Sequence, residues 1–140
     1  MLVRLATEEA VLAGDAFSPR QREEIIRAIQ AAGRQSNLTY SVYVGPSEGP
    51  ARAYARRRHA ELGAEAPDTV LIFVDPAARA LEIVTGSRAR RWLDDRACTL
   101  AAMSMTSAFA AGNLAGGIAQ GLQVLAEHAR HPQSLHTGGI

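Results

Sequence analysis

The chain has 140 residues and a net charge of +1, which suits one domain and argues against a dedicated nucleic-acid binder. Its 15 Lys and Arg residues are all arginines, so the sequence excludes a P-loop lysine and Schiff-base catalysis. The single cysteine, Cys98, excludes an intrachain disulfide and a zinc site built on a cysteine pair.

The sequence also bears on location. No run approaches the roughly 20 apolar residues of a membrane span. Acidic residues interrupt the N-terminal apolar stretch where a signal peptide would need continuity. We therefore expect a cytoplasmic protein without a membrane span.

The first predicted helix starts after Ser18. Pro19 suits the first helical position, and Ser18 with Gln21 forms a capping box. Ile25, Ile29 and Ala32 would make one buried stripe, and we expect the helix to stop at Gly33. The residues before Asp15 are compatible with a short strand or an irregular lead-in.

Three strands and a second helix follow. Residues 38–44 alternate as a strand does, and residues 51–62 predict an Arg-rich helix that Gly63 ends. Residues 69–75 are continuously apolar, as in a strand covered on both faces, and residues 80–86 read as its hairpin partner.

Two helices complete the predicted domain. Asp94 or Asp95 can cap a helix over residues 96–110, and Asn113 one over 114–130. Residues 1–130 would then form a single α/β domain, with residues 131–140 a disordered tail. The predicted fold is a small mixed sheet of three to four strands with helices packed on its faces, in the order α-β-α-β-β-α-α. The first two strands would be parallel and the hairpin strand antiparallel.

The glycine-rich stretch GNLAGGIAQGL, residues 112–122, invites comparison with a nucleotide-binding loop. Gly116 and Gly121 have P-loop spacing, but Leu122 and Gln123 stand where Lys and Ser or Thr are needed. We therefore interpret the stretch as a helix-packing seam, in which small residues let two helices approach closely. Its residues are Phe109, Gly112, Asn113, Gly117 and Gly121.

Three carboxylates form the candidate catalytic and metal site. Asp75 ends a central strand, and Asp94 and Asp95 stand at a helix entry, so loops beyond the strand ends could bring them together. Together they could hold Ca²⁺ or Mg²⁺, although no cofactor is certain, and such a metal could polarise a phosphoryl oxygen. The competing interpretation is that Asp94 and Asp95 are helix caps and Asp75 a turn residue.

Two arginine clusters form the candidate partner-binding surface. Their guanidinium groups could grip a carboxylate or phosphate of a protein partner, or serve only as solvated surface. No nucleic-acid partner is expected, and an oligomer is compatible with the sequence. The six residues are Arg56, Arg57, Arg58, Arg88, Arg90 and Arg91.

Cys98 lies in the first turn of a predicted helix, where the helix dipole would lower the pKa of its thiol. No histidine base accompanies it, so it reads as a small core residue.

Four ordered motifs resemble the TPM domain family, which includes plant thylakoid proteins linked to acid phosphatase activity and photosystem repair. The similar stretches are AGDAFSPRQREEI, VLIFVDPAARALEIVTG, WLDDRAC and FAAGNLAGGIAQGLQVL, which together span residues 12–129. The resemblance implies a TPM-like α/β fold, close to a bacterial branch without an established function, and places Asp95 on the family's acidic position. We expect a non-catalytic interaction or assembly module, with a weak metal-dependent acid phosphatase as the alternative.

Overall fold

The computed structural model describes residues 3–5 and 17–130. Their elements in chain order are β1 Val3–Leu5, α1 Pro19–Ser36, β2 Thr39–Val44, α2 Ala51–Ala60, the 3₁₀ helix η1 Gly63–Asp68, β3 Thr69–Asp75, β4 Ala80–Thr85, the 3₁₀ helix η2 Ala89–Arg91, α3 Asp95–Ala110 and α4 Leu114–His128. Among the helices within these ranges, none has both the length and the hydrophobicity needed to cross a bilayer. The prediction of a disordered tail lies outside the described residues.

The sheet is mixed and has the strand order β1-β2-β3-β4. β2 and β3 are parallel, from Thr39 beside Thr69 to Val44 beside Val74. β3 and β4 form the antiparallel hairpin, and β1 pairs antiparallel with β2 at the opposite edge. The predicted fold class is correct, and β1 adds the fourth strand before the first helix.

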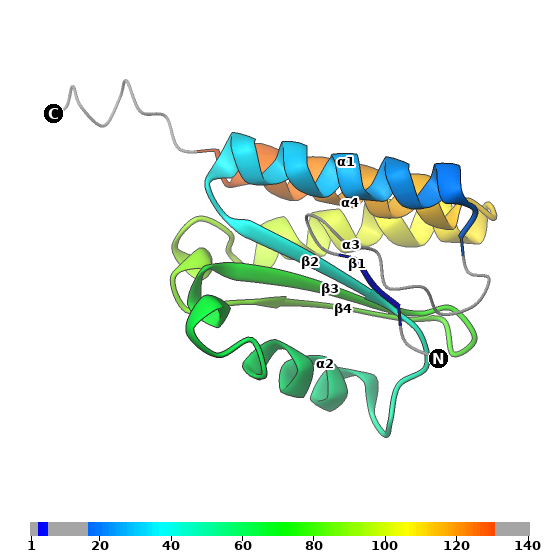
Figure 1. The fold of residues 1–140 in the computed structure, drawn as a ribbon, viewed down its shortest axis with the longest axis horizontal. Helices are drawn as coiled ribbons and strands as arrows, with labels where there is room; N and C mark the ends of the chain where they lie inside the picture. The colour runs from blue at the N-terminus through cyan, green and yellow to red at the C-terminus, as the bar shows by residue number, and fades with distance from the viewer. Residues whose placement is uncertain (1–2, 6–16, 131–140) are drawn as a thin grey trace, which may run out of the picture.

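The sheet lies between two helical layers of unequal size (Figure 1). Helices α1, α4 and α3 cover one face, where Val70, Ile72 and Val74 of β3 point into the main core. Helix α2 covers the other face, where Leu71 and Phe73 point. All seven residues of β3 are buried, which explains the absence of hydrophobic alternation in this strand.

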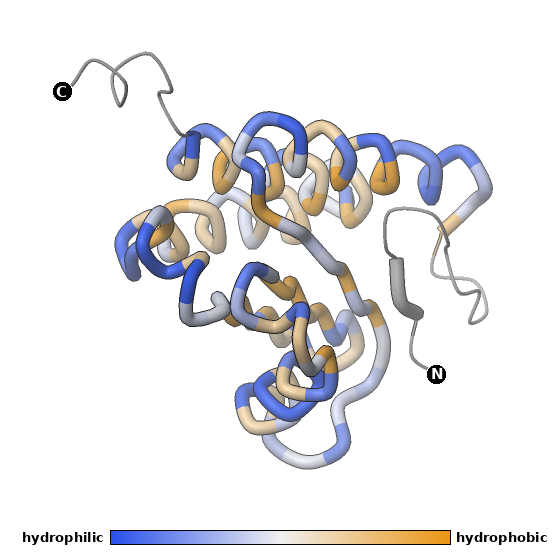
Figure 2. The backbone as a smooth tube through the Cα atoms, turned by 60° about the vertical axis from the view of Figure 1, so that its left-hand side comes forward, coloured by the Kyte–Doolittle hydropathy of each residue, from blue (hydrophilic) through white to orange (hydrophobic). Residues whose placement is uncertain are grey.

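The small core under α2 is held largely by aromatic residues. The rings of Tyr54 and Phe73 meet edge to face with centroids 5.4 Å apart. Helix α2 is rich in hydrophilic residues, as the lower helix in Figure 2 shows.

The predicted helix caps are confirmed. Ser18 Oγ accepts a hydrogen bond from the Gln21 N–H at 3.1 Å, and Gln21 Oε1 accepts one from the Ser18 N–H at 2.8 Å. Asp94 and Asn113 cap α3 and α4 in the same way, by accepting from the third residue along.

Two helix ends differ from the sequence prediction. Helix α1 continues past Gly33 to Ser36, because Asn37 adopts the left-handed conformation (φ 62°) and donates its N–H to the Gly33 carbonyl. Helix α2 ends at Ala60 rather than at Gly63, and Gly63 begins η1 instead.

Candidate functional site

Asp75 is buried at the end of β3, with 6% of its surface exposed. Its Oδ2 accepts a hydrogen bond from the Ser47 N–H at 3.0 Å, and its Oδ1 accepts one from the Ala78 N–H at 3.2 Å. Both carboxylate oxygens therefore organise the two loops that flank the end of β3. Asp75 thus has the turn role that the sequence offered as the competing interpretation.

The structure does not bring Asp94 and Asp95 to Asp75. Because β4 returns antiparallel to β3, Thr85 lies beside Val70, and the chain enters α3 from that end of the sheet (Figure 1). The length of β3 separates the two ends by about 20 Å. The prediction assumed that both loops lie at the same end of the sheet, whereas the antiparallel return of β4 separates them.

A shared metal site on these three carboxylates is therefore not formed. Within residues 3–5 and 17–130, no group of three or more His, Cys, Asp and Glu side chains could hold a metal ion. Calcium or magnesium binding stays a prediction for which the described residues offer no such ligand set.

Three of the six predicted partner-binding arginines donate hydrogen bonds within the domain. Arg58 pairs with Glu61 at 3.1 Å and lies over the Tyr43 ring, 5.2 Å from its centroid. Arg88 makes two hydrogen bonds to the Asp68 carboxylate, at 2.9 and 2.8 Å.

The third, Arg90, donates to the Thr85 carbonyl at 3.2 Å. The exposed arginines of the two clusters also include Arg56, Arg57 and Arg91, and Arg57 lies over the Tyr54 ring. The clusters thus contribute to the fold, and their binding role stays a prediction.

The glycines of the predicted seam lie where α4 meets α3. A Cβ atom on Gly117 would stand 2.8 Å from the Ala108 Cβ and from the Phe109 ring. A Cβ atom on Gly121 would stand 2.5 Å from Met105. The third seam glycine, Gly112, has φ +85° in the turn between the helices, a conformation that favours glycine.

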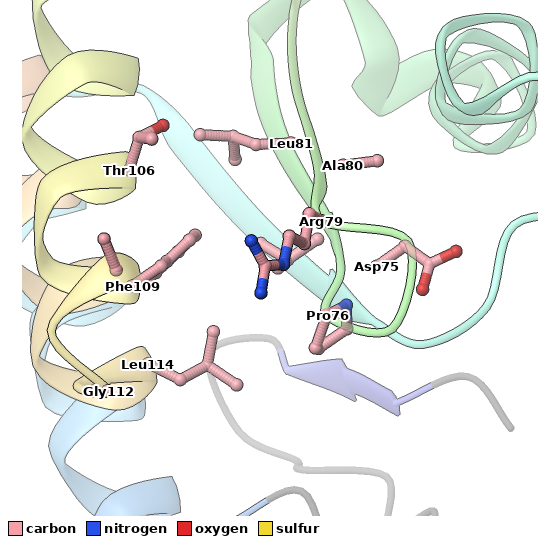
Figure 3. Close-up of a pocket in the computed structure, with 11 residues that line it drawn as sticks. Asp75, Pro76, Arg79, Ala80, Leu81, Thr106, Phe109, Gly112 and Leu114 are labelled. Atoms are coloured by element: carbon pink, nitrogen blue, oxygen red, sulfur yellow. The ribbon is translucent and has the colours of Figure 1, made fainter.

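A pocket of about 430 Å³ opens where the β3–β4 turn faces the end of α3. Leu81, Phe109 and Leu114 provide much of its apolar lining. Figure 3 shows the Arg79 guanidinium pointing from the turn toward α3, whereas the Asp75 carboxylate points to the opposite side. Arg79 is thus the one charged side chain directed into this pocket among the residues that line it.

Arg79 holds an unusual backbone conformation, with φ 55°. Residues with a side chain rarely adopt this left-handed conformation, which costs roughly 1–2 kcal/mol relative to ordinary backbone. Among the described residues, no hydrogen bond or ion pair engages its guanidinium. Arg79 is not among the site residues predicted from the sequence, although an arginine at the turn position before a hairpin strand was a usable signal.

The outer face of α3 differs from an ordinary solvent-facing helix. Residues 97–110 contain no charged side chain, yet Met103 is 63% exposed and Leu100 is 41% exposed. By contrast, exposed Glu23 and Arg27 form an ion pair on the outer face of α1. This face was not predicted from the sequence, where α3 was considered only as the partner of the glycine seam.

Cys98 is half-buried near the start of α3. Burial, together with the nearby carboxylates Asp95 and Asp94, raises the pKa of its thiol to about 11. These effects outweigh the helix dipole that the sequence analysis considered. Cys98 is therefore not an activated nucleophile.

Comparison with solved structures places this fold among known bacterial domains. The N-terminal domain of a protein from P. gingivalis matches with a TM-score of 0.70 and 20% identity, over 86% of this chain and 79% of that one. BA42 from Bizionia argentinensis matches with a TM-score of 0.72 and 15% identity, over 84% of each chain.

The N-terminal domain of cg2496 from Corynebacterium glutamicum matches with a TM-score of 0.69 and 14% identity, over 87% of this chain and 84% of that one. At these identities the likeness concerns the fold alone. No curated protein matches the chain. A family model described as a domain of unknown function, DUF5130, matches residues 4–126, and the chain therefore belongs to the DUF5130 family.

Proposed function

We propose that this domain is a non-catalytic protein-interaction module that binds its partner through the outer face of α3. The observation that carries the proposal is the exposure of Met103 and Leu100 on a helical face without charge. Exposed helix faces of monomeric proteins normally carry charged side chains, and contiguous exposed apolar surface marks interaction sites.

The neighbouring surface supports the same interpretation. Trp92, just before α3, is 45% exposed. Thr106 of the outer face also lines the pocket beside β4, so the face continues into a concave apolar surface. Aromatic residues and methionine are the side chains most enriched in protein interfaces.

We further propose that the chain is related to the TPM domain family. The four ordered motifs in the sequence support this relationship, and an assembly or maintenance role is compatible with a binding face on α3. The phosphatase alternative lacks a comparable observation, since its three carboxylates lie at two ends of the sheet.

A photo-crosslinking experiment tests the proposed face. A benzophenone amino acid is placed at position 103, and in a matched variant at position 27 on the charged face of α1. In cells that naturally produce the chain, we expect a discrete protein adduct from position 103 and none from position 27. The adduct should disappear when Leu100→Glu is added at unchanged melting temperature.

Adducts of equal yield from both positions, or none from position 103, would overturn the proposal. Loss of the adduct in Leu100→Glu together with loss of folding would call for Thr99→Glu, an exposed change on the same face.

A further inference from the structure

The pocket beside Arg79 lies next to an open edge of the sheet, and the two features fit one ligand. We propose that β4 binds the C-terminal segment of a partner protein as an added antiparallel strand. Its last side chain would occupy the pocket, and its terminal carboxylate would pair with Arg79. This inference rests on the proposed interaction function and names the chemistry of the partner.

The open edge follows from the sheet register. Gly86 donates its N–H to the Thr69 carbonyl at 3.0 Å, and antiparallel pairing alternates from there. Ala80, Glu82 and Val84 therefore direct their backbone groups toward β3. Leu81 and Ile83 direct theirs away from the sheet. No hydrogen bond between these outward groups and another described segment is formed.

The outward row has a defined end. The carbonyl of Thr85, the last outward residue of β4, accepts a hydrogen bond from Arg90 at 3.2 Å. The unpaired groups therefore lie toward the start of β4, beside the pocket. Such a row of unpaired donors and acceptors is a template for an extended peptide, whose main chain supplies affinity while pockets read its side chains.

The pocket determines what the end of that peptide must be. Its walls are mostly apolar, and Leu81 belongs to both the pocket and the open edge. The one charged group directed into it is the Arg79 guanidinium (Figure 3). A guanidinium favours a carboxylate, which it can bind through two parallel hydrogen bonds.

Strand direction selects the terminal carboxylate. Arg79 immediately precedes β4, so an antiparallel peptide reaches it with its C-terminal end. A parallel peptide would bring a terminal ammonium to the same guanidinium, and like charges repel. An apolar last residue with a free carboxylate satisfies the pocket and Arg79 at once.

The backbone of Arg79 supports a binding role for its side chain. Its φ of 55° suits glycine better than arginine. Within the described residues, the guanidinium makes no hydrogen bond that would hold the turn in this conformation. Disfavoured conformations of this kind cluster at ligand-binding positions.

The test uses two libraries of random heptapeptides, immobilised through their N-termini, one with free C-terminal carboxylates and one with C-terminal amides. We expect the domain to select peptides with an apolar last residue from the acid library only. Amidation of a selected peptide should weaken binding about tenfold, the scale of a charge-assisted hydrogen bond. Arg79→Gln should weaken the acid peptide equally and leave the amide unchanged.

Arg52→Gln is the matched control, because it removes an exposed positive charge from α2, on the other face of the sheet. It should leave both affinities within twofold. Single N-methylation along the selected peptide tests the added strand without altering the protein. Methylation of every second residue, whose N–H would bond to β4, should abolish binding, whereas methylation of the residues between them should be tolerated.

The inference is overturned by an empty selection, by equal selection from both libraries, or by N-methylation effects without alternation. The two proposals fail separately. An adduct at position 103 with an empty selection would retain the α3 face and reject the β4 edge. Peptide binding without that adduct would do the reverse.

Discussion

Gly86 packs directly against the backbone of η1, so that a Cβ atom at this position would overlap the carbonyl oxygens of Ala66 and Pro67. We therefore expect Gly86→Ala to lower the free energy of unfolding by about 1–3 kcal/mol or more, since backbone atoms cannot move aside cheaply. Urea denaturation would measure it. Ser87→Ala, at the adjacent exposed position, should stay within about 0.5 kcal/mol of wild type, and equal stability of both variants would refute the close approach.

In the glycine seam, helix propensity and close packing have opposite effects on stability. Replacing a helical glycine by alanine normally stabilises a helix by about 1 kcal/mol. At Gly117 the new methyl group would meet the Ala108 Cβ at 2.8 Å, and we expect a net loss of about 1–2 kcal/mol. Thermal unfolding of Gly117→Ala measures this loss, with Gln120→Ala at an exposed position of the same helix as the control. A raised melting temperature for Gly117→Ala would contradict the prediction.

The left-handed backbone of Arg79 predicts a gain in stability. Arg79→Gly should raise the free energy of unfolding by about 0.5–1 kcal/mol, the relief of backbone strain less the greater entropy of unfolded glycine. Arg79→Gln keeps the strain and should show no such gain. If Arg79→Gly destabilises the domain as much as Arg79→Gln or more, the turn depends on the arginine side chain, and the backbone of Arg79 no longer indicates a binding role.

The exposed pair of Asp68 and Arg88 predicts a pH effect. The hydrogen bonds from Arg88 lower the pKa of Asp68 below its usual 3.8. Because the folded-state pKa is depressed, the pair stabilises above about pH 4, and this contribution is lost as pH falls through the folded pKa.

A carboxyl NMR titration would detect it. In the Arg88→Gln variant the pKa of Asp68 should return toward 3.8. The free energy of unfolding of this variant should approach that of wild type as the solution is acidified. An unchanged Asp68 pKa in this variant would show that the pair does not form in solution.

Cys98 should react slowly in the folded protein. With burial raising its pKa to about 11, only about one thiol in a thousand is ionised at pH 8. We expect alkylation by iodoacetamide at pH 8 to be roughly 100-fold slower than in guanidinium chloride, where the thiol regains an ordinary pKa. The raised pKa also implies that stability falls as pH rises from about 9 to about 11. Equal alkylation rates in the two solutions would rule out the shift.

Much of the local structure could be read from the sequence because its causes are local. The Ser18–Gln21 capping box, the caps at Asp94 and Asn113, and the uninterrupted apolar run of β3 each depend on residues a few positions apart. Periodicity and turn residues likewise predicted the hairpin and the parallel pair. The helix ends at Gly33 and Gly63 were wrong because Asn37 can end a helix in place of glycine, and because residues after Ala60 tighten into a 3₁₀ turn.

The candidate sites depended on which end and which face of the sheet each residue reaches, and only the tertiary structure decides that. Asp75 and Asp94 are 19 positions apart in sequence, yet the antiparallel return of β4 places them at opposite ends of β3. The alternation of β3 turns Asp75 toward α2, while Arg79 in the following turn points toward α3. Composition and spacing determined the elements of this domain, and the direction of its strands determined which side chains can act together, since strand pairing joins residues that no local pattern connects.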